Sequence, residues 1–167
     1  MHKIAGELLP TVFHVAARSL AAQSLSIFGD HTDVMSVRNT GFALMSAASV
    51  QEVHDLAILS HLATLDTSIP FLNFFDRFRT SHEIQNVEVL SYDALKEFVN
   101  TEHVNAFKDR GIRPEKPFVK VGAENPDVYF QGRETVNKYY EQTPAIIQKY
   151  MDRVSKKTGR SYKLFDY

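Results

Sequence analysis

The feature that most constrains the fold is a strand–helix–strand pattern in the first half of the chain. Residues 41–47 and 69–75 are continuous apolar runs, as expected of strands that are covered on both faces. Between them, residues 50–65 carry apolar side chains at a helical spacing, in a stripe wide enough to cover a sheet. Ser49 and Glu52 have the spacing of a capping box, which marks the start of that helix. The pattern predicts a βαβ unit with parallel strands and a right-handed crossover.

One further strand is predicted at residues 11–16, which are rich in β-forming residues. After it, the sequence predicts a turn at residues 29–31 and then a short helix through Arg38, capped by Asp30 or Thr32. Together these elements predict an α/β protein with a partial three-layer parallel sheet of three strands. A typical sheet has about five or six strands, so the chain is expected to be part of a domain.

The second half of the chain has a different character. A short helix is predicted at residues 92–100, and residues 110–140 are expected to form a long irregular excursion because they contain three prolines and three glycines. Thr143 and Pro144 predict the cap and first residue of a last helix. That helix is expected to end at Gly159.

Length and composition set further limits. A chain of 167 residues is expected to form one domain, with an α/β core at 1–90 and a helical and irregular extension at 91–167 that ends in an interdomain linker. The formal net charge of -1 excludes a strongly basic nucleic-acid binder. The absence of cysteine excludes disulfides, thiolate zinc sites and iron–sulfur clusters held by this chain. We see neither a secretory signal nor a membrane-spanning run, and therefore expect a cytoplasmic protein.

Candidate binding residues follow from the predicted topology, because open α/β sheets bind ligands beyond the carboxyl ends of their strands. Arg18 follows the first predicted strand, and its guanidinium suits a carboxylate or a phosphate; the alternative is a surface or interdomain ion pair. Ser49 is predicted to be a helix cap, a role compatible with lining a pocket. His31 lies beside Asp30, where turn formation explains the pair better than catalysis does.

No metal site is predicted from the histidines. His54 and His61 are seven residues apart, which is two helical turns, whereas helical ligand pairs are three or four residues apart. The chain also lacks a phosphate-binding loop, a dinucleotide fingerprint and a nucleophile elbow. The residues by themselves therefore indicate an α/β fragment with a candidate anion site at Arg18.

Several blocks of sequence resemble the pyruvate:ferredoxin (flavodoxin) oxidoreductase family. The resemblance covers nearly the whole chain and is carried by residues 3–8, 13–18, 26–31, 74–84, 125–134 and 158–163. One departure is Arg77, which stands where the family has glycine. The resemblance implies a sheet of the thiamine diphosphate-binding, pyrimidine-domain type, and a chain that corresponds to the later two-thirds of the family's N-terminal domain.

The same resemblance implies an activity for the parent enzyme. Members of the family oxidatively decarboxylate pyruvate to acetyl-CoA and reduce ferredoxin or flavodoxin. They use thiamine diphosphate, Mg²⁺, iron–sulfur clusters and coenzyme A. The resemblance places the early strands, the catalytic threonine and glutamate, the diphosphate-binding domain and the cluster cysteines outside this chain. The chain is therefore expected to be inactive alone, without a complete catalytic set, and to come from a homodimeric enzyme.

The resemblance also bears on the candidate residues. Arg18 matches the arginine that binds the substrate carboxylate, and Ser49 matches a position, serine or asparagine, that lines the same pocket. Related thiamine enzymes place a histidine from a comparable loop near the reacting carbon, which makes His31 a further pocket candidate. Arg18 recognises only a carboxylate, so pyruvate and another 2-oxoacid, such as oxobutyrate, both stay open as substrates. A second hypothesis also stays open, in which the chain is a non-catalytic interaction module that retains the fold.

Overall fold

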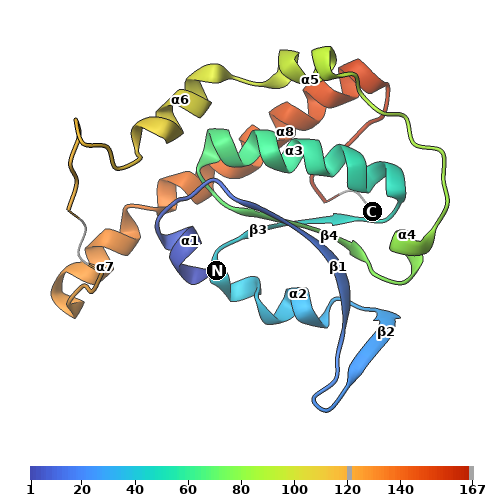
Figure 1. Ribbon diagram of the computed structural model, residues 1–167, viewed down its shortest axis with the longest axis horizontal. Helices are drawn as coiled ribbons and strands as arrows, with labels where there is room; N and C mark the ends of the chain where they lie inside the picture. Colours follow the sequence, from blue (N-terminus) through green and yellow to red (C-terminus); the bar gives the residue numbers. More distant parts are fainter. Residues whose placement is uncertain (120–121, 166–167) are drawn as a thin grey trace.

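A four-stranded sheet forms the centre of the protein, seen in the computed structural model, which describes residues 1–119 and 122–165 (Figure 1). The strands are β1 (Val12–Leu20), β2 (Leu25–Gly29), β3 (Ala43–Ala47) and β4 (Phe71–Asp76). Their order in the sheet is β2-β1-β4-β3. β1, β4 and β3 are parallel, and β2 is antiparallel to β1. The α/β class and the parallel core are therefore confirmed.

The predicted βαβ unit is present between β3 and β4. Helix α3 (Val50–Thr67) connects the two strands, which pair in parallel. Ser49 Oγ accepts a hydrogen bond from the Glu52 amide at 3.2 Å, and the Glu52 carboxylate accepts one from the Ala48 amide at 2.6 Å. These two bonds satisfy amides at the start of the helix, as the capping-box pattern predicts.

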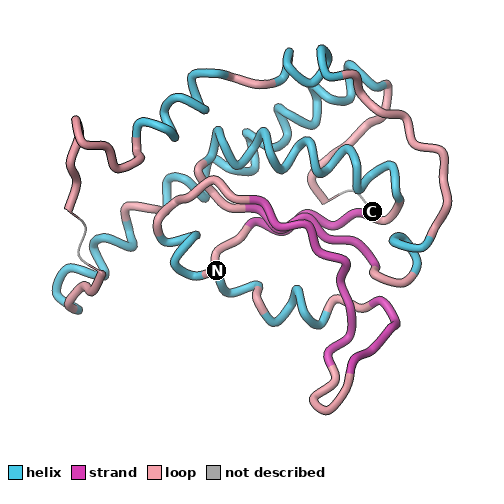
Figure 2. Tube along the Cα trace, in the orientation of Figure 1, coloured by secondary structure: helices cyan, strands magenta, loops and turns pink. Residues whose placement is uncertain are grey.

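Strand β2 was not predicted. It is a short edge strand that forms a hairpin with the end of β1 and projects away from the main body (Figure 2). Helix α2 (Thr32–Ser36) and a 3₁₀ turn (Arg38–Thr40) follow it. The predicted caps are wrong, since the N-cap is His31, which makes no side-chain capping bond. The Asp30 carboxylate does not cap the helix but accepts hydrogen bonds from the Ser19 hydroxyl and the His31 amide.

Helices cover both faces of the sheet (Figure 1). On one face, α3 and α8 (Asn137–Thr158) bury the larger core. The buried members of that core are Met45, Ala47, Leu56, Leu59, Leu62, Ala63, Ile69, Phe71, Phe98, Ile147, Tyr150, Met151 and Val154. On the other face, α1 (His2–Gly6) and α2 cover a smaller core. Its buried members are Ala5, Ala17, Val34, Phe42, Leu72 and Phe74. Phe71 and Leu72 are neighbours in β4 whose side chains point to opposite faces, so this one strand contributes to both cores.

The second half is more helical than predicted. Its elements before α8 are α4 (Arg79–His82), α5 (Tyr92–Phe98), α6 (Thr101–Asp109) and α7 (Pro126–Glu134). Helix α7 lies within the predicted irregular excursion, so that expectation is wrong over those residues. Its Asn125 N-cap and its proline in the first turn are local start signals, which the surrounding glycines and prolines obscured. No helix in residues 1–119 or 122–165 is long and apolar enough to span a membrane.

The predicted start of the last helix is also wrong. Helix α8 begins at Asn137, and Pro144 lies inside it. Proline has no amide to donate to the Tyr140 carbonyl one turn earlier, and the Thr143 hydroxyl instead donates to the neighbouring Tyr139 carbonyl, at 2.6 Å. The helix also gains from a buried stripe against α3, which outweighs the local preference. The stripe consists of Ile147, Tyr150, Met151 and Val154. The predicted end at Gly159 is confirmed by its φ of 75°.

Candidate functional site

The carboxyl ends of the three parallel strands meet at one end of the sheet, where open α/β sheets bind ligands. Strand β4 ends at Asp76, opposite Ala17 of β1. β1 does not end there but continues to Leu20, and in this extension Arg18 pairs with Gly29 of β2. The expectation that Arg18 lies on a loop after the strand is therefore wrong, because the unpredicted β2 continues the ladder past the end of β4.

Arg18 is half-buried at this strand end. Its backbone amide donates to the Asp33 carboxylate, at 3.2 Å from Oδ2. Its guanidinium makes no hydrogen bond or ion pair with any residue in the described part of the chain. A guanidinium carries five donors and is charged at any physiological pH, so this group is available to an anionic ligand.

Asp30 follows Gly29, the β2 partner of Arg18, and its carboxylate forms no ion pair with Arg18. Its carboxylate accepts hydrogen bonds from the Thr32 hydroxyl, from the His31 amide at 2.7 Å and from the Ser19 hydroxyl at 3.0 Å. These bonds, the one from Thr32 above all, lower the pKa of the Asp30 carboxyl. Asp30 thus organises the turn after β2, as the sequence predicts for a turn residue.

Asp76 is a further carboxylate at this end of the sheet. It accepts a hydrogen bond from the Arg79 amide at 2.5 Å and so closes the turn after β4. A Cβ atom added to Gly29 would lie 1.8 Å from Asp76 Oδ2, so the Asp76 carboxylate would have to move to accommodate any other residue there. Sequence reasoning placed Asp76 in a candidate loop after the third predicted strand but did not single it out, and it missed Asp33. For Asp76 a signal existed, because an aspartate directly after an apolar strand lies at the ligand-binding end of the sheet.

The other two predicted site residues lie in different parts of the sheet region. The His31 ring meets Phe74 of β4 edge-on, with ring centroids 5.1 Å apart, and His31 begins α2, which packs against β1. Ser49 follows β3, and its hydroxyl is engaged as the cap of α3. Since β4 separates β1 from β3, Ser49 lies roughly 10 Å across the sheet from β1. The structure therefore places His31 on the face of the sheet that α2 covers, and Ser49 two strands away from β1.

Histidines come together where the spacing did not indicate it. His14 of β1 and His61 of α3 approach to 3.2 Å between their Nε2 atoms, and the Asn73 amide contacts Nδ1 of His14 at 3.3 Å. Burial, and then the charge of His14, lower the pKa of His61. His54 contacts the Asp55 carboxylate at 2.9 Å instead. Within residues 1–119 and 122–165 there is no group of three or more histidine, cysteine or acidic side chains that could hold a metal.

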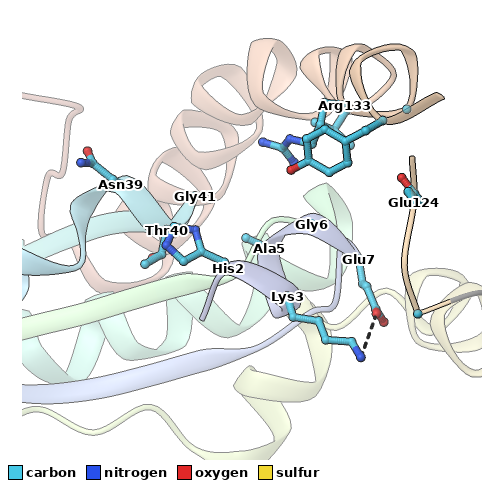
Figure 3. Close-up of a pocket in the computed structure, with 14 residues that line it drawn as sticks. His2, Lys3, Ala5, Gly6, Glu7, Asn39, Thr40, Gly41, Glu124 and Arg133 are labelled. Carbon is cyan, nitrogen blue, oxygen red and sulfur yellow. Dashed lines mark ion pairs between the residues drawn. The ribbon is translucent and has the colours of Figure 1, made fainter. Parts of the chain in front are cut away.

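The hollow shown in Figure 3, of about 650 Å³, lies at the other end of the sheet. It is lined by α1, by the turn before β3 and by α7, with Lys3, Glu7 and Arg133 among its charged groups. Lys3 pairs with Glu7 at 3.8 Å. Since α1 precedes β1 and Gly41 precedes β3, this hollow is at the amino ends of the strands. The topology therefore favours the Arg18 end as the binding site.

A second arginine, Arg160, lies just after α8 and is fully engaged. It donates to the buried Asp55 carboxylate from Nε at 2.6 Å and Nη2 at 3.1 Å, and to Glu88 from Nη1 at 2.6 Å. The Tyr162 hydroxyl also donates to Asp55, at 2.6 Å. Burial by itself raises the pKa of Asp55, but hydrogen bonds from Arg160, Tyr162 and His54 outweigh it and lower that pKa. We call these five residues the Asp55 cluster.

Comparison with known proteins decides the family. The family described as "Pyruvate flavodoxin/ferredoxin oxidoreductase, thiamine diP-bdg" matches residues 1–152. The chain belongs to this family. The resemblance stated from the sequence is thereby confirmed, and the mixed sheet with helices on both faces agrees with a thiamine diphosphate-binding domain of the pyrimidine type.

Curated members of the oxidoreductase family match the chain over its whole length. It is 60% identical to the pyruvate-flavodoxin oxidoreductase of Trichormus variabilis and 56% identical to the pyruvate:ferredoxin oxidoreductase of Moorella thermoacetica, each over 167 residues. It is 54% identical to a pyruvate dehydrogenase [NADP(+)] of Cryptosporidium parvum. The match covers 100% of this chain but 14%, 14% and 9% of these relatives. The chain thus spans about a seventh of the two bacterial relatives.

Proposed function

We propose that this chain forms the substrate-carboxylate side of the active site in a thiamine diphosphate-dependent pyruvate oxidoreductase. The observation that carries the proposal is the half-buried Arg18 guanidinium, which has no partner among the described residues and lies at the carboxyl end of the sheet. Family membership and relatives named for pyruvate oxidation support it. Arg18 would hold the carboxylate of pyruvate through two parallel charge-assisted hydrogen bonds, which fix the orientation of the keto carbon.

The other proposed site residues have lesser roles. His31 lies exposed at the start of α2 and would line the pocket beside Arg18. Ser49 caps α3 at the far edge of the parallel strands and would contribute to the same pocket only through the helix end. Arg18 is thus the one group of the three with charged donors to offer.

The described residues do not fit Mg²⁺ and a diphosphate. Three carboxylates at this end of the sheet, Asp30, Asp33 and Asp76, already accept hydrogen bonds from backbone amides, and the described residues include no group of three or more acidic or histidine side chains that could hold a metal. We propose that thiamine diphosphate and Mg²⁺ are held in a site shared with other parts of the parent enzyme. Because the chain has no cysteine, the iron–sulfur clusters would also belong to other parts.

The wider assignment follows from the same proposal. The parent enzyme would be a cytoplasmic homodimer that oxidises pyruvate to acetyl-CoA with coenzyme A and passes electrons to ferredoxin or flavodoxin. Residues 1–90 would be the core of an incomplete pyrimidine-binding domain, and 91–167 an extension that leads into an interdomain linker. This chain alone would be inactive. A carboxylate-binding arginine does not distinguish pyruvate from another 2-oxoacid, so that choice would depend on residues elsewhere.

Replacement of Arg18 in the full-length parent enzyme tests the proposal. Truncating one partner of a desolvated charge pair costs roughly 2 to 5 kcal/mol, so Arg18→Ala is expected to lower kcat/KM for pyruvate by roughly 30- to 5,000-fold. Arg18→Lys should recover only part, because an ammonium cannot reproduce the two-pronged geometry. Steady-state kinetics measure both variants, and thiamine diphosphate affinity should stay near the wild-type value.

Arg38→Ala is the matched control, since Arg38 is exposed and lies in the turn that leads to the amino end of β3. It should leave kcat/KM unchanged. Normal kinetics in a well-folded Arg18→Ala enzyme would overturn the proposal. A parent protein without any 2-oxoacid oxidation, when loaded with its cofactors, would instead support the non-catalytic interaction module.

A further inference from the structure

Asp33 makes an unusual contact at the place where Arg18 leaves the central sheet. It is the second residue of α2, and its carboxylate accepts hydrogen bonds from two backbone amides. One comes from Arg18 at 3.2 Å, and the other from Val34 at 2.7 Å. The carboxylate therefore joins the start of α2 to the backbone of β1 at the residue whose side chain we assign to the substrate.

The backbone of β1 changes its pairing partner at Arg18. From Val12 to Ala17, β1 pairs with β4, but β4 ends opposite Ala17. Beyond that point β1 pairs only with β2, and the register shifts between Arg18 and Leu20. Irregularities of this kind, such as β-bulges, disrupt the ladder locally and often re-aim a side chain next to a functional site. Asp33 supplies a further hydrogen bond to the Arg18 backbone from outside the sheet.

The Asp33 carboxylate binds the backbone of Arg18 and not its guanidinium. Although its Oδ2 atom is 3.2 Å from the Arg18 amide nitrogen, the carboxylate forms no ion pair with the guanidinium. An acceptor that binds the main chain leaves all five side-chain donors for a ligand.

We propose that Asp33 is a positioning residue for Arg18: its carboxylate fixes the main chain from which the guanidinium reaches the substrate carboxylate. This inference rests on the function proposed above for Arg18. In this proposal the Asp33 carboxylate binds the two backbone amides and not the substrate. Its effect on catalysis therefore passes entirely through Arg18, and this dependence separates a positioning role from general support of the fold.

A double-mutant cycle in the full-length parent enzyme tests this dependence through kcat/KM for pyruvate. Loss of a hydrogen bond to a charged acceptor and the resulting misplacement predict a decrease of about 10-fold for Asp33→Ala. Asp33→Asn keeps one acceptor oxygen for the Arg18 amide and should recover much of that loss. In an Arg18→Ala background, Asp33→Ala should cause no further decrease.

Asp93→Ala is the matched control, because Asp93 is also the second residue of its helix, α5, and does not contact Arg18. It should leave kcat/KM unchanged. In the chain itself, Asp33→Ala should speed hydrogen exchange at the Arg18 amide, and Asp93→Ala should not.

The outcomes separate the two proposals. An equal decrease from Asp33→Ala with and without Arg18 would show a merely structural role and overturn the positioning inference alone. No decrease in the Arg18-containing enzyme would overturn it too. Normal kinetics in Arg18→Ala would overturn the proposed function and this inference together.

Discussion

Arg18 and Arg160 show two ways in which this domain uses the same side chain. Arg160 makes hydrogen bonds to Asp55 and Glu88 from three of its nitrogens. Arg18 makes none from its guanidinium to any described residue. Arg160 joins segments that lie 105 residues apart in the sequence, whereas Arg18 lies within β1, just past the point where β4 ends.

The difference between the two arginines suggests different roles: Arg160 stabilises the fold, and Arg18 is available to bind a ligand. A buried carboxylate is costly unless its hydrogen-bonding capacity is satisfied, and Asp55, which is fully buried, meets that requirement through Arg160 and Tyr162. An arginine without a partner adds little to folding, but its donors remain available to a ligand. We therefore expect substitutions in the Asp55 cluster to affect unfolding, and substitution of Arg18 to affect substrate binding.

The largest effect is expected from Arg160→Ala, which leaves the Asp55 carboxylate buried without its main partner. The free energy of unfolding should fall by about 3 to 5 kcal/mol, measured by urea denaturation of the chain. Arg113→Ala is the matched control, since Arg113 pairs with Asp109 on the surface, and should cost about 0.5 kcal/mol or less. Equal losses in the two variants would contradict the comparison.

The pH dependence of the Arg160→Ala effect sharpens the comparison. The lowered pKa of Asp55 means that its ionised form stabilises the folded wild type above about pH 4, and that this contribution is lost as the pH falls through the folded-state pKa. In Arg160→Ala, burial is expected to raise that pKa, so acid relieves the unpaired charge. The stability difference between the two proteins should therefore shrink from pH 7 to pH 3 in urea titrations. A constant difference would show that Asp55 is not the group responsible.

A smaller effect is expected from Tyr162→Phe, which removes one hydrogen bond to the charged Asp55. The loss should be about 1.5 to 3 kcal/mol at neutral pH. Burial, and then the bond to Asp55, raise the pKa of Tyr162 to about 12. The tyrosine's contribution is thus complete below about pH 10 and is lost as the pH rises from 10 to 12, so the wild type should lose its advantage over that range. Tyr92→Phe is the control, because Tyr92 is exposed; it should change neither the free energy of unfolding at neutral pH nor its pH dependence.

The smallest effect on stability is expected from Arg18→Ala in the chain. Because the guanidinium has no partner among the described residues, the free energy of unfolding should change by no more than about 0.5 kcal/mol. Urea denaturation beside Arg160→Ala measures the contrast directly. A loss of more than about 2 kcal/mol would place Arg18 among the structural residues and remove the distinction between the two arginines.

The helical starts show where local sequence is sufficient and where it is not. The cap of α3 was predicted because Ser49 and Glu52 bind amides within a few residues of themselves. The start of α8 was not, because a proline is a strong local stop signal and the helix continues through Pro144 only with the support of packing on α3. Strand β2 was also missed because its formation depends on a distant segment. Its five residues form a strand because β1 extends to pair with them.

For the site, the sequence by itself determined that a guanidinium would lie near the carboxyl end of an apolar strand, since that depends only on Arg18 and the residues before it. It also determined the parallel βαβ core, because hydrophobic period and helix caps are local properties. Tertiary structure alone decided that Asp33 would meet the Arg18 amide, that His14 would meet His61, and that Asp55 would bind Arg160. These contacts join residues 15, 47 and 105 positions apart, and no periodicity within one element specifies which distant side chains a folded sheet brings together.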